Sequence, residues 1–230
     1  MYSELGVNNA ISNNLRIFKS GNHRDYSTNY GQLVKLVPQN SYLVCVFEHG
    51  IGLIEVNERA AINQASTEQV YIKSISVLPE KMSMIHLDFG SQWPESVIST
   101  PTGVYGVDTV AKVIWRLDVG GGFETLSDFK VKNFLNNNIT FSLHETSPIV
   151  GIRNVKTHYN AFKKDVIFTF YDDINTIEDK AWSLCYNEDT NVKTFTTFYS
   201  WLPSYSANID NVFFTFDRQA SKELAMLYDY

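Results

Sequence analysis

The sequence contains few of the residues that define several large classes of protein. Of its 230 residues, 2 are cysteine, 6 are proline and 12 are glycine. So few cysteines exclude a disulfide-rich secreted scaffold, and the low proline and glycine content excludes collagen-like and proline-rich disordered chains. Cys45 and Cys185 both lie in apolar runs, which favours two buried free thiols made in a reducing compartment.

Positive charge and long apolar segments are also scarce. The chain has 19 Lys and Arg against 25 Asp and Glu, a formal net charge of −6. No run of basic residues is longer than the pair Lys163–Lys164, which argues against tight nucleic-acid binding through released counterions. An acidic wall would still let DNA slide past, because it repels phosphates. The apolar runs are shorter than the roughly 18 residues of a membrane helix, so we expect neither a membrane span nor a secretion signal.

Aromatic and β-branched residues are abundant instead, with 13 Tyr, 15 Phe and 4 Trp among them. Such residues suit the half-buried, pleated surface of a sheet, and they occur here in short runs separated by turns. The sequence therefore predicts an all-β fold. Strands are expected over residues 42–47, 53–56, 70–77, 96–99, 103–107, 113–117, 123–126, 166–171, 181–186, 192–199, 212–216 and 224–228.

Two segments depart from this pattern. Residues 1–30 are polar and rich in Asn and Ser, and we expect them to form an extended arm or connection that precedes a β domain over residues 31–230. Within that domain, Ser127 and Asp128 are expected to cap one short inserted helix that runs through Leu135 and stops at the asparagines 136–138. The final expected strand runs almost to Tyr230, so we expect the domain to be part of a larger protein.

Several hairpins share one pattern: a hydrophobic strand, an acid, a polar turn with Lys, and a large apolar residue on the return strand. They start near Val104, Val166 and Val212, 62 and 46 residues apart, and a related hairpin starts 61 residues earlier at Leu43. This spacing favours a β-propeller-like array of short antiparallel sheets that bury their faces against one another. An all-β sandwich would contain similar hairpins, and neither a WD nor a kelch motif is present.

No arrangement of residues predicts catalysis. The histidines lack metal-ligand spacing; they are His23, His49, His86, His144 and His158. Carboxylate pairs occur at 172–173, 178–179 and 188–189, where they could serve glycoside hydrolysis or Ca²⁺ binding. All three pairs lie in predicted turns, in which short acids bond to the local backbone. We therefore expect a non-enzymatic protein with no catalytic or metal-binding residues and no cofactor.

An exposed contact surface is the most specific site that the sequence suggests. Trp201 and Tyr205 lie in a loop-like segment, and His49 lies in a hairpin turn. Trp115 and Trp182 lie inside strand runs and are expected in the core. Because aromatic rings can stack on sugars, an alternative function is a carbohydrate-binding β-propeller module that recognises a host surface glycan, with Trp201 and Tyr205 as the stacking rings.

Several stretches resemble virion proteins of the crAss-like bacteriophages of gut Bacteroidales. They are residues 46–52, 103–109, 114–116, 165–170, 182–188 and 198–206. In particular they resemble the tail muzzle family, which is similar in architecture to the nozzle proteins of short-tailed phages. The resemblance implies a structural component of the virion tail, made in the host bacterial cytoplasm, that forms part of the conduit for DNA ejection. Its partners would be other copies of itself in a ring and other tail proteins, with DNA bound only in passage.

Overall fold

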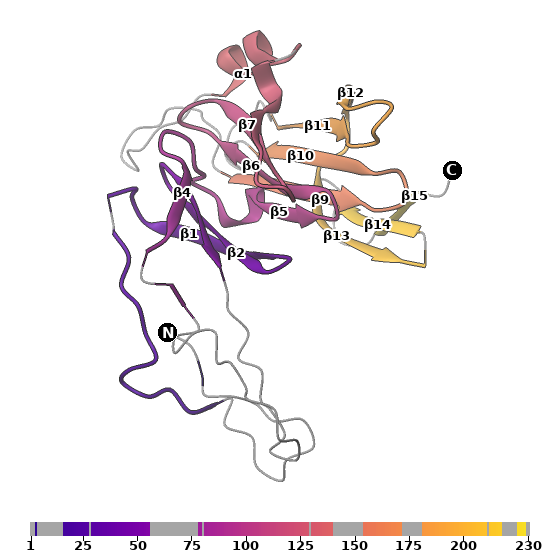
Figure 1. Ribbon diagram of the computed structural model, residues 1–230. Coiled ribbons are helices and arrows are strands. Elements are labelled where there is room, and N and C mark those ends of the chain that lie inside the picture. Colours follow the sequence, from indigo (N-terminus) through magenta and orange to yellow (C-terminus); the bar gives the residue numbers. More distant parts are fainter. Residues whose placement is uncertain are drawn as a thin grey trace, which may run out of the picture.

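The computed structural model describes residue 3 and residues 16–27, 29–55, 78–79, 81–128, 130–139, 154–171, 181–210, 212–217 and 225–228. These residues form four antiparallel sheets, which follow one another along the chain (Figure 1). The expected all-β class is confirmed. The predicted arm at residues 1–30 stays a prediction, although residues 16–27 contain no strand.

Each sheet is a meander, in which strands that are neighbours in sequence pair with one another. Sheet A contains β1 (Leu33–Gln39), β2 (Tyr42–Phe47), β3 (Ile51–Glu55) and β4 (Ser83–His86). Sheet B contains β5 (Ile98–Thr100), β6 (Gly103–Asp108), β7 (Val113–Asp118) and β8 (Phe123–Thr125). Sheet C contains β9 (Asn154–Asn160), β10 (Asp165–Tyr171), β11 (Trp182–Asn187) and β12 (Thr194–Tyr199). Sheet D contains β13 (Pro203–Ile209), β14 (Val212–Asp217) and β15 (Ala225–Tyr228).

The hairpins identified by the sequence repeat are the second and third strands of the four sheets: β2–β3, β6–β7, β10–β11 and β14–β15. The four strands expected over residues 96–99, 103–107, 113–117 and 123–126 form sheet B. The strand expected over residues 70–77 lies outside the described residues, as do the turns of the hairpins that start near Val166 and Val212. Each sheet therefore contains one of the repeated hairpins, and the sheets follow the chain order of those hairpins.

Four strands were not predicted. Three of them, β1, β9 and β13, are the first strands of their sheets, and the fourth is β4, the last strand of sheet A. The expectation that residues 201–205 form a loop is wrong from Pro203 onward, where β13 begins. Strands β9 and β13 carry several polar residues, which hides them from a reading based on hydrophobicity. Strand β1 is largely apolar but contains Lys35 and Pro38.

The short helix is real but begins later than expected. It is α1 (Lys132–Asn138), preceded by the 3₁₀ turns η2 (Pro94–Ser96) and η3 (Leu126–Asp128) earlier in the chain. The predicted cap is wrong, because Ser127 Oγ instead accepts the Ile114 N–H at 3.1 Å. The asparagines 136–138 lie within the helix, which closes with a hydrogen bond from Ile139 N to Leu135 O at 2.8 Å.

The hydrophobic core is divided into layers between successive sheets. One cluster joins sheets A and B around Trp115, a second joins B and C around Phe168, and a third joins C and D around Phe213. Helix α1 contributes Leu135 to the layer between B and C (Figure 1). Sheets B and C are thus buried on both faces, which explains the nearly continuous apolar runs of β6, β7, β10 and β11.

The first strands also lie next to one another. Strand β1 contacts β5, β5 contacts β9, and β9 contacts β13. Polar bonds join these places: Lys35 Nζ donates to Val97 O at 2.7 Å, Thr157 Oγ1 to Ser96 O at 2.6 Å, and Lys156 Nζ to Ser204 O at 3.3 Å. The edges formed by the first strands of successive sheets therefore lie next to one another.

Candidate functional site

The most elaborate polar site of the described residues is centred on Glu188, at the junction of sheets B and C. Glu188 directly follows β11, and its backbone N–H donates to Lys164 O at 2.9 Å, which fixes the start of the turn. Its side chain is buried, with 5% of the residue exposed. The turn therefore directs a carboxylate away from solvent and into the space between two sheets.

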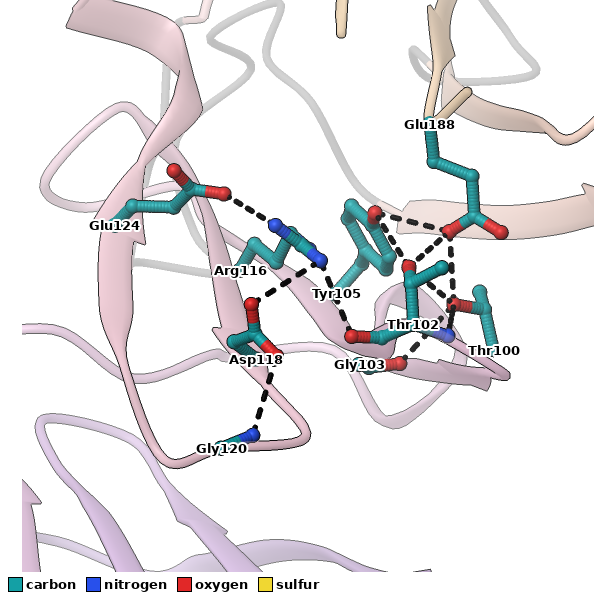
Figure 2. Close-up of polar contacts among 9 residues, drawn as sticks. All are labelled: Thr100, Thr102, Gly103, Tyr105, Arg116, Asp118, Gly120, Glu124 and Glu188. Carbon is teal, nitrogen blue, oxygen red and sulfur yellow. Dashed lines mark hydrogen bonds and ion pairs between the residues drawn. The ribbon is translucent and has the colours of Figure 1, made fainter. Parts of the chain in front are cut away.

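Four hydroxyl groups donate to this carboxylate. In sheet B, Glu188 Oε2 accepts from Thr102 Oγ1 at 2.5 Å, Thr100 Oγ1 at 2.9 Å and the Tyr105 hydroxyl at 3.0 Å (Figure 2). In sheet C, Glu188 Oε1 accepts from the Tyr159 hydroxyl at 2.6 Å. One acidic side chain thus ties the first two strands of sheet B to the first strand of sheet C.

The electrostatics of the site keep both tyrosines protonated. Burial raises the pKa of Tyr105, and the nearby Glu188 carboxylate raises it further. Burial also raises the pKa of Tyr159, as does its hydrogen bond to Glu188. Because a phenolate would be buried beside a carboxylate, the donating hydroxyl is the favoured form of each tyrosine.

A buried cation lies beside the cluster. The Arg116 guanidinium sits 5.8 Å from the centroid of the Tyr105 ring, and its Nη2 donates to Thr102 O at 3.1 Å. Arg116 also pairs with Glu124 at 2.7 Å and with Asp118 at 3.5 Å (Figure 2). Positive charge near the carboxylate reduces the cost of burying it.

The arrangement joins two sheets. The described hydroxyls that surround Glu188 donate to both of its oxygens. Its sequence neighbour Asp189 is exposed to a greater degree and pairs with Lys164 at 2.7 Å. The prediction of a structural turn acid fits Asp189, but Glu188 is a buried link between sheets. The pairs 172–173 and 178–179 lie outside the described residues.

A second polar junction joins sheets C and D. His158 is buried, its Nε2 donates to Pro203 O at 2.8 Å, and its Nδ1 lies 2.9 Å from Ser206 Oγ. The neutral ring satisfies both contacts if Ser206 donates to Nδ1. Burial lowers the pKa of His158 to about 4, so the imidazole is neutral at physiological pH.

The three predicted contact residues do not form one surface. Trp201 is buried, with 9% exposed, which corrects the expectation of an exposed ring. Tyr205 is 65% exposed, and Lys156 Nζ lies 4.6 Å from the centroid of its ring. His49 is an exposed residue of the turn between β2 and β3. A role in contact for Tyr205 and His49 stays a prediction.

Other sequence expectations concern reactive groups. Both cysteines are buried and free, as predicted, and burial raises the pKa of Cys45 to about 11 and of Cys185 to about 12. Within the described part of the chain, no group of three or more His, Cys, Asp or Glu side chains could hold a metal ion. No helix in that part is long and apolar enough to cross a membrane.

Sequence reasoning did not find the Glu188 cluster. Its donors come from Thr100, Thr102, Tyr105 and Tyr159, which are spread over 60 residues and have no fixed spacing to Glu188. Only the packing of two sheets brings them together.

Comparison with known proteins gives two matches. Residues 1–219 match the sequence model of the family described as Crassvirus muzzle protein. The chain is also similar to the Muzzle protein of Bacteroides phage crAss001, with 24% identity over 194 residues. That alignment covers 84% of this chain and 13% of the phage protein, so the chain spans about an eighth of the length of this curated relative.

Proposed function

Because the chain belongs to the crassvirus muzzle protein family, we propose that it is a structural, non-enzymatic segment of a phage tail that forms part of the conduit for DNA ejection. The family assignment agrees with the resemblance that the sequence suggested. The role in the conduit rests on what the geometry offers: layered sheets, a buried polar link between them, and no catalytic arrangement among the described residues.

The single observation that carries the proposal is the repeated contact between first strands. Four meander sheets follow in chain order, and β1, β5, β9 and β13 touch in succession along one side. In a β-propeller, the first strand of each blade lies nearest the central axis and the blades pack face to face. We propose that the four sheets are successive blades of such a propeller-like array, in agreement with the core layers between them.

Charge supports passage of DNA without tight binding. The formal net charge of −6 gives a surface that repels phosphates, so a conduit lined by this protein would hold DNA weakly. A conduit needs walls that resist deformation more than it needs affinity. Buried links such as Glu188 provide that stiffness, since apolar contacts alone are not directional.

The proposed partners are further copies of the protein in a ring, together with other tail proteins. One face of sheet D supplies a suitable surface, because cross-strand pairs place Tyr205 beside Phe216 and Ile209 beside Val212. Tyr205, Ile209 and Phe216 are each at least half exposed. An exposed apolar strip of this kind is typical of an interaction surface.

The test is to locate the protein in virions. Purified, DNA-filled particles of a crAss-like phage that encodes this chain would be analysed by peptide mass spectrometry and by immunogold electron microscopy with antibodies to residues 81–128. We expect its peptides in intact virions and gold at the tail end far from the capsid. Absence from virions whose other tail proteins are well covered, or gold on the capsid, would refute the proposal.

A further inference from the structure

Sheets C and D enclose a cavity of about 260 Å³ that the proposed tail role does not use. Its walls come from the hairpin between β9 and β10, from the end of β12, from the connection into sheet D, and from β14. The lining residues are Asn160, Lys163, Asp165, Ile167, Phe198, Tyr199, Ser200, Trp201 and Phe213. Cavities that hold drug-sized ligands measure roughly 300–1,000 Å³, so this one suits a ligand about the size of one sugar ring.

A buried carboxylate is the most informative group in the cavity. Asp165 is 8% exposed, and its Oδ1 accepts the Asn187 side-chain amide at 2.7 Å. Among the described residues, no Lys, Arg or His forms an ion pair with it. The Cys185 thiol also interacts with this carboxylate. A carboxylate has about four accepting positions, so Asp165 retains accepting capacity for hydroxyl groups of a ligand.

Asn160 supplies a donor beside this acceptor. It is 7% exposed, and its Oδ1 accepts the backbone N–H groups of Phe162 and Lys163, both at 3.1 Å. No described residue accepts a hydrogen bond from its side-chain nitrogen. Carboxylate and carboxamide together can accept from and donate to the adjacent hydroxyls of a polyol.

Aromatic rings form the apolar side of the cavity. Tyr199 and Trp201 lie with ring centroids 5.0 Å apart and planes tilted by 34°, and Phe213 is buried beneath them in the same cluster. The neighbouring Phe198 ring packs on the opposite face of sheet C, against Phe134 and Trp182. Such rings present flat apolar surfaces, which match the C–H faces of a pyranose.

Charge decides between classes of small ligand. Asp165 repels anions from the cavity, and Lys163, which also lines it, repels cations. A neutral molecule with several hydroxyl groups meets neither penalty. We propose that the cavity between sheets C and D binds one neutral sugar residue of a surface glycan, with Asp165 and Asn160 on its hydroxyls and the aromatic rings on its face.

The proposal keeps the carbohydrate-binding function that the sequence suggested, but it places the binding site in the cavity between sheets C and D and not on an exposed loop. Trp201 contributes from within the cavity wall, and Tyr205 is not among the lining residues. The site is independent of the tail role, because a glycan could be held by a virion protein or by a protein with another function.

The test uses saturation-transfer NMR and calorimetry on the 230-residue chain, with neutral hexoses, 6-deoxyhexoses and N-acetylhexosamines as probes and with choline and acetate as charged controls. We expect binding of at least one neutral sugar, weakened about ten-fold or more by Asp165→Asn, because a hydroxyl-bonding site loses discrimination when its buried acceptor is altered. Asp118→Asn makes the same chemical change at a carboxylate outside the cavity and should leave affinity unchanged.

A second pair of variants protects the test against misfolding. Tyr199→Ala removes a partly buried ring from the cavity, and Phe195→Ala removes a partly buried ring of the same strand, β12, from the opposite face of sheet C, where it packs with Tyr186. Only Tyr199→Ala should weaken binding, while the thermal unfolding of both variants shows whether they remain folded. Binding of no neutral sugar, binding of choline or acetate instead, or equal losses in the two members of a pair would overturn the proposal.

Discussion

The two junctions on either side of sheet C are built by different means. Among the described side chains, which exclude those of β15, the core cluster between sheets B and C contains 13 buried hydrophobic residues, whereas the cluster between C and D contains four. The smaller junction relies on polar contacts, which include His158 to Pro203 O, Ser183 Oγ to Trp201 O at 3.0 Å, and Asn208 Nδ2 to Tyr159 O at 2.8 Å.

This difference separates two roles of buried contacts. Apolar burial stabilises in proportion to area but does not fix an orientation, whereas hydrogen bonds contribute less and fix which groups meet. Even the large junction contains one such set of bonds, at Glu188. We therefore expect loss of packing to have its largest effect between B and C, and a change of pH to have its largest effect between C and D.

The largest expected effect is the loss of a ring from the junction between B and C. Phe168 is fully buried, and Phe168→Ala should lower the free energy of unfolding by about 3–5 kcal/mol. Phe213→Ala at the smaller junction should cost less, because a thin layer beside a cavity collapses more easily. Urea denaturation followed by Trp fluorescence measures both, and equal losses would contradict the comparison.

Removal of the buried Glu188 carboxylate should have the second-largest effect on stability. Glu188→Ala leaves four hydroxyls without their acceptor, and we expect a loss of about 3 kcal/mol of stability. Glu188→Gln keeps one accepting oxygen and should lose less. Asp189→Asn changes the exposed neighbour and should stay within about 0.5 kcal/mol. The same denaturation experiment applies, and similar losses at the two positions would show that the cluster does not join the sheets.

The polar junction between C and D should depend on pH through His158. Its pKa in the folded protein is about 4 against an ordinary value of 6.5, so the unfolded chain binds the proton more readily. The contribution of the neutral His158 ring to the free energy of unfolding is therefore fully present above about pH 6.5. It falls as the pH drops toward 4, by up to about 3 kcal/mol. Two nearby charges also affect the pKa of His158: Lys156 lowers it further and Glu95 raises it.

The measurement compares wild type with His158→Gln between pH 7 and pH 4, because acidic side chains titrate in the same range and their contribution cancels in the difference. The variant should lose less stability than the wild type as the pH falls. An unchanged pH profile would exclude His158 as the sensitive group.

The smallest expected effect lies at the exposed edge of the same junction. Tyr205→Ala removes the ring that Lys156 covers at 4.6 Å, an exposed cation–π contact worth roughly 0.5–1 kcal/mol. Thermal unfolding of this variant should differ from wild type by a few degrees at most. A loss as large as that of Phe213→Ala would mean that the outer face of sheet D contributes to the core.

Sequence reasoning recovered the strands that hydrophobicity marks. Strands β6, β7, β10 and β11 are buried on both faces, so their apolar runs were visible, and the repeat correctly grouped β2–β3, β6–β7, β10–β11 and β14–β15. Strands β9 and β13 were missed because several polar residues interrupt their apolar ones, and each contacts a neighbouring first strand. A pattern of alternating apolar residues does not report such contacts.

The surroundings of the site residues were likewise not visible in the sequence. Trp201 was singled out for its ring and was expected in a loop, but packing places it in the wall of a cavity. Glu188 was assigned, with Asp189, to a turn in which short acids bond to the local backbone, and no local feature of the sequence distinguishes it from Asp189. Its burial follows from four donors that arrive from other strands.

The sequence by itself determined the all-β class and the order of the hairpins, since each depends on residue type and short-range spacing. Only the tertiary structure decided which faces meet, that Glu188 and His158 are buried at successive junctions, and that Asp165 and Asn160 share a cavity. These outcomes depend on contacts between residues far apart in the chain, and short-range patterns do not encode them.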